Sequence, residues 1–259
     1  MPATGIEPVE TAMSSPVAPA PFSTGLAETT PQVTVDFDAT YVGTVDDDSL
    51  IGGTADDLMF GGDGYDILSG FSGNDVLYGN VGLDTVDGGP GNDLIYGGQD
   101  DDLLSGGAGN DTLVGGLNSP ETFVFRDGQL WIPAGQDSLS GGAGDDLVYG
   151  NQGDDLLAGG SGDDTLYGGQ DADRLTGGAD DDLLYGGLGG DAFVYSDAND
   201  GRDTIHGFDV AEDQILLAAG TSVAIRTDLG DDAMLRLSTG TRITLIGVAD
   251  PDDIAVASF

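Results

Sequence analysis

The sequence predicts an all-β protein in which short strands stack as coils of 18 residues and form two parallel sheets. Three observations support this fold class. From about residue 43 to 194 a glycine-rich motif returns every nine residues. Each copy ends in three residues with an apolar centre, a strand too short to be stable alone. The last residue of each copy alternates between large and small, so two copies make one coil with two unlike faces.

The composition excludes several classes of function. The chain has 259 residues, of which 47 are acidic and 6 basic, and its formal net charge is −41 at pH 7. All six basic residues are Arg, so Lys-dependent phosphate loops are excluded and nucleic acid is not an expected partner. Cysteine is absent, which excludes disulfides and thiolate metal sites. No apolar run is long enough to span a bilayer, so we expect no transmembrane segment.

The acidic residues favour the shorter side chain, since 42 are Asp and five are Glu. An acidic surface that serves only solubility has little reason to exclude Glu. A site that needs a short carboxylate on a tight turn does exclude it. The bias therefore indicates that the Asp residues have a specific structural or chemical task.

Changes in composition and period divide the chain into six expected segments. A Pro-, Ala-, Thr- and Ser-rich start without an apolar period predicts a disordered tail. The motif then runs in two arrays with an interruption between them. The expected segments are the tail at 1–33, the N-terminal edge of the stack at 34–51, the first array at 52–114, an insert at 115–136, the second array at 137–194 and a β-rich C-terminal cap at 195–259.

The physical logic of one repeat is visible in Gly-Gly-Asp-Gly-Tyr-Asp-Ile-Leu-Ser at 61–69. Glycine at the first, second and fourth positions permits a sharp turn with positive φ. The eighth residue is apolar in every copy and is expected to point inward. The sixth residue is Asp in the copies of both arrays: Asp57, Asp66, Asp75, Asp84, Asp93, Asp102, Asp111, Asp137, Asp146, Asp155, Asp164, Asp173, Asp182 and Asp191.

Some copies depart from this pattern. Asp100, Asp171 and Asp180 replace the fourth-position glycine, and Phe71 replaces the second, which leaves the turn geometry there open. Arg174, the only basic residue inside the arrays, is expected to point outward.

The insert and the C-terminal segment contain further strand patterns. Asp127-Gly128 lies between alternating apolar residues and predicts a hairpin. Its aromatic residues Phe123, Phe125 and Trp131 form either a ligand or partner patch, or part of an irregular coil that packs on the stack. Beyond the second array, strands are expected around 193–195, 203–208, 213–217, 223–226, 233–237 and 242–248.

The repeat Gly-Gly-x-Gly-x-Asp-x-apolar-x, present in 13 near-complete copies, resembles the repeats-in-toxin family of bacterial secreted proteins. The resemblance implies a right-handed parallel β-roll with calcium ions between turns stacked on the same side. It pairs Asp57 with Asp75, Asp66 with Asp84, Asp146 with Asp164, and Asp155 with Asp173. Glycine carbonyls would complete each shell, at Gly61, Gly62, Gly64, Gly88, Gly89, Gly91, Gly106, Gly107, Gly109, Gly141, Gly142, Gly144, Gly159, Gly160 and Gly162.

The chemistry of the repeat suits calcium. Calcium prefers six to eight oxygen ligands from carboxylates and carbonyls, whereas magnesium keeps its waters and needs a small octahedron. The two arrays offer room for roughly ten ions. The alternative is that each Asp only caps its turn. Stacked carboxylates would then repel one another strongly, so we expect folding to require the cation.

The resemblance also implies a route and a location. The segment after the arrays is similar to the one that follows the roll in serralysin-type and haemolysin-type proteins, where the C-terminal region carries a type I secretion signal. A cleaved N-terminal signal requires positive charge near its start, and the first basic residue of this chain is Arg126. We therefore expect a bacterial extracellular protein that uses type I export machinery and folds on meeting calcium.

No catalytic motif supports an enzyme. His206 is the only histidine, and neither a His-Glu-x-x-His helix nor a Gly-x-Ser-x-Gly elbow occurs. Besides a non-catalytic calcium-binding roll, two alternatives remain: an accessory module that binds extracellular polysaccharide, and a membrane-active secreted protein. The module would use an outward face of tyrosines at Tyr78, Tyr96, Tyr149, Tyr167 and Tyr185. The same ladder also has a purely structural interpretation, cross-strand stacking that stabilises the sheet.

Overall fold

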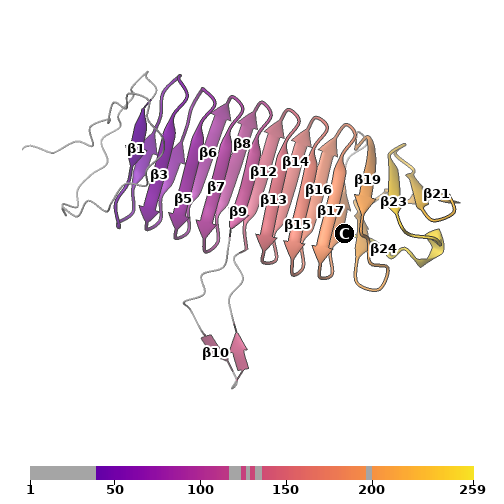
Figure 1. The fold of residues 1–259 in the computed structure, drawn as a ribbon. Helices are drawn as coiled ribbons and strands as arrows, with labels where there is room; N and C mark the ends of the chain where they lie inside the picture. Colours follow the sequence, from indigo (N-terminus) through magenta and orange to yellow (C-terminus); the bar gives the residue numbers. More distant parts are fainter. Residues whose placement is uncertain (1–38, 117–123, 127–128, 132–135, 197–199) are drawn as a thin grey trace, which may run out of the picture.

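The computed structural model describes residues 39–116, 124–126, 129–131, 136–196 and 200–259, and every structural statement below concerns these residues. Their strands form a flattened solenoid in which one coil follows another along a single axis (Figure 1). The expected N-terminal tail lies outside the described residues, and so does Phe123 of the expected aromatic patch, while Phe125 and Trp131 are described as strand backbone only.

Two large sheets make up the solenoid within the described residues. The larger sheet has the strand order β1 (Thr40–Val42), β3 (Leu58–Asp63), β5 (Val76–Val81), β7 (Leu94–Gln99), β9 (Thr112–Gly116), β13 (Leu147–Gln152), β15 (Thr165–Gln170), β17 (Leu183–Leu188), β19 (Arg202–His206), β23 (Arg242–Ile246), β22 (Ala233–Leu237) and β21 (Val223–Asp228). The smaller sheet has the order β2 (Ser49–Ile51), β4 (Ile67–Ser69), β6 (Thr85–Pro90), β8 (Leu103–Ala108), β12 (Ser138–Ala143), β14 (Leu156–Ser161), β16 (Arg174–Ala179), β18 (Ala192–Tyr195), β20 (Gln214–Leu217) and β24 (Val256–Ser258). Successive coils pair in parallel, as the alternation of large and small residues predicts.

The pairing register confirms the coil of 18 residues. Met59 lies opposite Leu77 in the larger sheet, and Leu68 lies opposite Val86 in the smaller one. Most repeat strands are longer than the three residues expected, because pairing continues through the glycines: after Phe60 pairs with Tyr78, Gly62 pairs with Asn80. The neighbouring strands therefore stay in register through the glycine positions of the repeat.

A single apolar row fills the space between the two sheets. Each repeat strand buries its eighth repeat position, and the buried pattern alternates with outward residues. The row consists of Met59, Leu68, Leu77, Val86, Ile95, Leu104, Leu113, Leu139, Val148, Leu157, Leu166, Leu175, Leu184 and Phe193. The interior is narrow, so no copy is stable without the coils above and below it.

The two arrays form one continuous solenoid across the insert. Strand β12 pairs with β8, and β13 pairs with β9, in the same register as elsewhere. The amide of Asp102 donates to Oδ1 of Asp137 at 2.8 Å across 35 residues. The insert contributes the predicted hairpin, in which β10 (Val124–Arg126) and β11 (Gln129–Trp131) are antiparallel. It therefore leaves and re-enters the stack at a single turn.

The coils continue past the last repeat and end in a differently built segment. Strands β19 and β20 extend the two sheets, and β24 closes the smaller sheet beside β20. The larger sheet ends in β23, which is parallel to β19, followed by antiparallel β22 and β21. A short 3₁₀ helix, η1 (Pro251–Asp253), precedes β24. The described residues include no helix long and apolar enough to cross a membrane.

Candidate metal centre

The sixth-position aspartates line the two edges of the solenoid in continuous rows. In each row the amide of one Asp donates to Oδ1 of the Asp one coil further on, at 2.7–3.1 Å. One row leads into the larger sheet and consists of Asp57, Asp75, Asp93, Asp111, Asp146, Asp164, Asp182 and Asp203. The other leads into the smaller sheet and consists of Asp48, Asp66, Asp84, Asp102, Asp137, Asp155, Asp173, Asp191 and Asp213.

All four Asp pairs expected from the resemblance are stacked neighbours. Asp57 donates to Asp75 at 2.7 Å and Asp66 to Asp84 at 2.9 Å. The second array repeats this, from Asp146 to Asp164 at 2.8 Å and from Asp155 to Asp173 at 2.9 Å. The backbone amide of one coil is thus bound by the carboxylate of the next, a contact whose reach fits Asp and explains the scarcity of Glu.

The second carboxylate oxygen is the unusual feature of each turn. The repeat aspartates are at most 3% exposed, yet in the described structure the Oδ2 atoms of all of them but Asp57 lack any hydrogen-bond partner. Buried polar groups in native proteins are nearly always satisfied, and an unpaired buried charge costs several kcal/mol. These orphaned oxygens belong to Asp66, Asp75, Asp84, Asp93, Asp102, Asp111, Asp137, Asp146, Asp155, Asp164, Asp173, Asp182, Asp191 and Asp203.

The orphaned oxygens are confined to the interior coils. At the N-terminal edge, Oδ2 of Asp57 accepts from the amide of Gly53 at 2.8 Å, and Oδ2 of Asp48 accepts from Thr44. At the other edge, Oδ2 of Asp213 accepts from the amide of Asp209 at 2.8 Å. At the ends of the stack, Oδ2 of the row aspartate therefore accepts a hydrogen bond from its own turn. In the interior coils, where turns stack on both sides, Oδ2 has no hydrogen-bond partner.

The glycines shape the space beside each orphaned oxygen. A Cβ on the first glycine of a repeat would collide with the carboxylate of its own turn and lie too close to a carbonyl oxygen of the next coil. At Gly159, for example, the carboxylate is that of Asp164 and the carbonyl is that of Gly177. A Cβ on the second or fourth glycine would collide with a carbonyl of the preceding coil, as at Gly160 and Gly162. Carboxylate and carbonyl oxygens therefore converge in a space that only glycine leaves open.

The departures from the glycine pattern keep the same backbone. Phe71 has φ +74° at the second position, and Asp100, Asp171 and Asp180 have φ between +76° and +82° at the fourth. Phe71 therefore keeps a left-handed conformation in its turn, at a cost for a bulky side chain of about 1 kcal/mol. The stacking of identical coils overrides the local preference.

Burial strongly affects the protonation of these rows. Desolvation raises the aspartate pKa values, repulsion from neighbouring carboxylates raises them further, and the amide of the preceding coil partly offsets this. The pKa is about 6 for Asp66, Asp75, Asp137, Asp146 and Asp191, about 7 for Asp84, Asp93, Asp155 and Asp182, and about 8 for Asp102, Asp164, Asp173 and Asp203. Without a cation the carboxylates would have to be neutralised by protons.

A calcium ion fits these turns better than a transition metal. In the described residues, no three His, Cys, Asp or Glu side chains cluster as a side-chain metal site would require. Each turn offers only hard oxygen donors, one orphaned carboxylate oxygen and stacked backbone carbonyls. Calcium accepts such a mixed oxygen shell and tolerates irregular geometry. The resulting sites depend on backbone shape, which a search for side-chain clusters does not detect.

The predicted ligands lack three members of the rows, Asp48, Asp203 and Asp213, and one supporting ladder was not predicted. Asp203 and Asp213 lie beyond the last full repeat, yet each accepts from the preceding row member. At Asp203 and Asp213 the sequence keeps only the Asp-x-apolar part of the repeat motif and lacks its glycines. The exposed fifth repeat position also forms a ladder, in which Oδ1 of Asn74 accepts from the amide of Asn92 at 2.9 Å. This outer ladder runs opposite to the inner one and adds no buried charge.

The predicted tyrosine face is present on the outer side of the larger sheet. Phe60, Tyr78 and Tyr96 stack with ring centroids 4.9–5.0 Å apart, and Tyr149, Tyr167, Tyr185 and His206 continue the row at 4.5–4.9 Å. Val114 lies between the two groups, opposite both Tyr96 and Tyr149. The only histidine thus extends an aromatic stack. Arg174 lies on the outer side of the smaller sheet, 5.3 Å from the ring centroid of Phe259.

A comparison with protein families identifies the repeat. The family model of the RTX calcium-binding nonapeptide repeat (4 copies) matches at 34–68, 51–86, 69–104, 87–119, 134–166 and 158–193, more than half of the chain. The chain belongs to this family. RTX repeat proteins typically bind calcium and are typically secreted, and the matched segments contain the repeat aspartates from Asp57 to Asp191.

Two further comparisons add little to the family assignment. No curated protein matches the chain. Among solved structures, the chain is similar to the extracellular lipase LipA from Serratia marcescens, with 24% identity and a TM-score of 0.38 over 77% of this chain. The chain spans only 40% of the length of that lipase, and the likeness carries no functional argument.

Proposed function

We propose that this RTX chain is an extracellular calcium-binding β-roll that acquires its fold when it meets calcium and acts as a non-catalytic scaffold. The observation that carries the proposal is the double row of buried carboxylate oxygens without a hydrogen-bond partner. Burying so many like charges side by side is unfavourable unless a cation or a proton offsets them.

One turn of the second array shows which residues would hold an ion. Oδ2 of Asp164 is buried and open, while Oδ1 is fixed by the amide of Asp146 at 2.8 Å. The carbonyls of Gly159, Gly160 and Gly162 belong to the same turn and would complete the shell. The corresponding Asp and Gly residues named above would repeat this arrangement along both edges. We propose about ten ions per chain. If each ion needs at least one orphaned oxygen, the 14 orphaned oxygens set the upper limit.

Bound calcium supplies positive charge between successive turns. The chain's own residues determine what that charge accomplishes. Without it, the anionic rows repel and the glycine-rich turns lose a large conformational entropy on folding. Extracellular calcium is near millimolar, which matches the affinity range of extracellular calcium modules. Folding would therefore begin after export, and the unfolded anionic chain would be the form handled by the type I machinery.

The proposed non-catalytic role is supported by how the titratable groups are engaged. The buried carboxylates each accept a backbone amide, and the assigned task of their second oxygen is cation binding. His206 stacks on Tyr185 with ring centroids 4.9 Å apart. Carboxylates held by calcium are poorly suited to proton transfer.

The test is a calcium titration of the full chain by far-UV circular dichroism and calorimetry. We expect a coil spectrum in EDTA, a β spectrum in millimolar calcium and a stoichiometry of several ions per chain. Magnesium at the same concentration should not induce the β spectrum. An identical β spectrum in EDTA and in calcium would contradict the proposal.

A further inference from the structure

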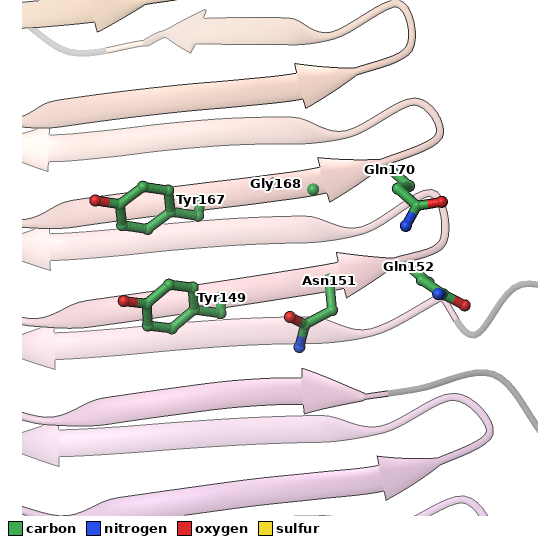
Figure 2. Close-up of a pocket in the computed structure, with 7 residues that line it drawn as sticks. Tyr149, Asn151, Gln152, Tyr167, Gly168 and Gln170 are labelled. Atoms are coloured by element: carbon green, nitrogen blue, oxygen red, sulfur yellow. The ribbon is translucent and has the colours of Figure 1, made fainter.

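The outer face of the larger sheet contains a hollow beside the proposed calcium-binding turns. It has a volume of about 400 Å³ and lies across strands β13 and β15 (Figure 2). Its lining residues are Tyr149, Asn151, Gln152, Tyr167, Gly168, Gly169 and Gln170. Gly168 and Gly169 belong to a turn of the kind proposed to bind calcium, but the side chains of the two tyrosines, Asn151 and the two glutamines are not among the proposed calcium ligands.

The chemistry of the hollow is uncharged and suited to hydroxyl groups. Gln152 and Gln170 lie opposite each other on neighbouring strands, and Asn151 lies opposite Gly169, which has no side chain. Figure 2 shows the amides on one side of the hollow and the two tyrosine rings on the other. Each amide both donates and accepts hydrogen bonds. The lining residues include no charged side chain.

A related arrangement occurs three strands away on the same face. Strands β5 and β7 place Tyr78 opposite Tyr96 and Asn80 opposite Gly98, as in the hollow. The two positions differ in one pair: Val81 lies opposite Gln99 on β5 and β7, whereas Gln152 lies opposite Gln170 in the hollow. With about 4.8 Å between strands, the two positions are roughly 14 Å apart. The face therefore offers two related positions in one line across the strands.

The break in the aromatic row lies between these two positions. The rings of the row cover one another's faces, with interplanar angles of 2–7° for the tyrosine pairs on either side of the break. Val114 occupies the row between Tyr96 and Tyr149, so each of these rings has a valine, and no ring, on that side. The faces of Tyr96 and Tyr149 thus flank the small apolar side chain of Val114. Two strand spacings, about 10 Å, separate the two tyrosines.

We propose that this face binds a linear, uncharged polysaccharide that runs across the strands from Asn80 to Gln170. Tyrosine faces at the Val114 break pack against the C–H faces of sugar rings, and the amides of Gln152 and Gln170 bind hydroxyl groups. With about ten bound calcium ions the formal charge of −41 becomes about −21, which still repels polyanions such as acidic glycans and leaves neutral glycans as the fitting class. This binding goes beyond the calcium function and requires only the folded roll.

The test is a neutral and acidic glycan array probed with the calcium-loaded full chain, followed by calorimetry with the best neutral hexasaccharide. We expect binding to neutral glycans only. The double variant Q152A/Q170A should weaken it about tenfold, since two hydrogen bonds are lost. V114Y, which fills the break with a ring, should weaken it by a similar factor. S161A, on the smaller sheet, is the matched control and should bind like the unmodified chain.

Each variant is first shown to fold by its calcium-induced β spectrum, so that failure of glycan binding is separate from failure of calcium-dependent folding. A folded chain that binds no neutral glycan on the array overturns the proposal. Preference for acidic glycans overturns it as well, and so does equal affinity for the unmodified chain, Q152A/Q170A and V114Y.

Discussion

The repeat solenoid and the C-terminal segment after β20 are both built of β-strands, but their interiors differ. Along the solenoid, one apolar row is flanked by two rows of buried carboxylates with open oxygens. In the C-terminal segment, strands β22 and β23 pair antiparallel and bury Ala233, Leu235, Leu237, Ile243 and Leu245. No buried side-chain oxygen of β22 or β23 lacks a partner, whereas the solenoid leaves its buried Oδ2 atoms without a protein partner.

This difference suggests a division of labour between the two regions. Strand β23 pairs in parallel with β19 over Arg202–His206 and presents a complete strand edge to the last coil. A segment that needs no cation can thus serve as the template on which the cation-dependent coils assemble.

Chelation should affect the two regions unequally. In EDTA, amides of the solenoid such as Val148 and Leu166 should exchange hydrogen at least about a hundredfold faster than in calcium. Amides of Leu235 and Leu245 should keep more of their protection, because their surroundings contain no orphaned carboxylate. Hydrogen exchange followed by mass spectrometry measures both. Equal loss of protection in the two regions would contradict the proposed contrast.

Removing one charge from a row should weaken the solenoid locally. Asp164→Asn keeps an oxygen for the amide of Asp146 but loses the anionic oxygen. We expect about 3 kcal/mol lower stability in calcium and a lower ion stoichiometry by calorimetry. Asp231→Asn, exposed in the C-terminal segment, is the control and should change neither. An Asp164→Asn chain with unchanged stoichiometry would remove Asp164 from the set of ligands.

Substitution of two glycines with similar φ angles distinguishes the stability cost of close stacking between coils from the cost of backbone strain. Gly160 has φ +126° and its Cβ would collide with the carbonyl of Gly142, whereas Gly240 has φ +114° and open space around it. Gly240→Ala should cost about 1 kcal/mol from strain alone. Gly160→Ala should cost about 3 kcal/mol, because the coils must separate. Thermal unfolding in calcium measures the pair, and equal costs would mean that the close approach is unimportant.

Acid should partly replace calcium in the solenoid. The folded-state aspartate pKa values of about 6 to 8 exceed the ordinary value of 3.8, so the folded ion-free chain binds more protons than the unfolded chain. This stabilisation is fully present below about pH 4 and is lost as the pH rises through 6 to 8. A pH titration in EDTA should therefore show β structure appearing on acidification. A spectrum in EDTA that stays coil down to pH 4 would contradict the raised pKa values.

Much of the fold followed from the period of the sequence. The eighth-position residues form the core, the sixth-position aspartates form stacked rows, and β10 and β11 of the insert are antiparallel as expected. Strand length was underestimated, because pairing through glycines such as Gly62 depends on an identical neighbour. Asp203 and Asp213 were missed because their turns lack the glycine signature that marked the other copies.

The amino-acid sequence by itself determined the 18-residue coil, the inward apolar row, the positions of the turns and the family, since each follows from residues within one period. Only the tertiary structure decided which carboxylate oxygens remain open, that the arrays join across the insert, and that Val114 interrupts the tyrosine row beside a hollow. Those features arise between coils, and a hydrogen bond such as that from Asp102 to Asp137 depends on which coil becomes the neighbour. Local propensity contains no information about that choice, which stacking and charge decide together.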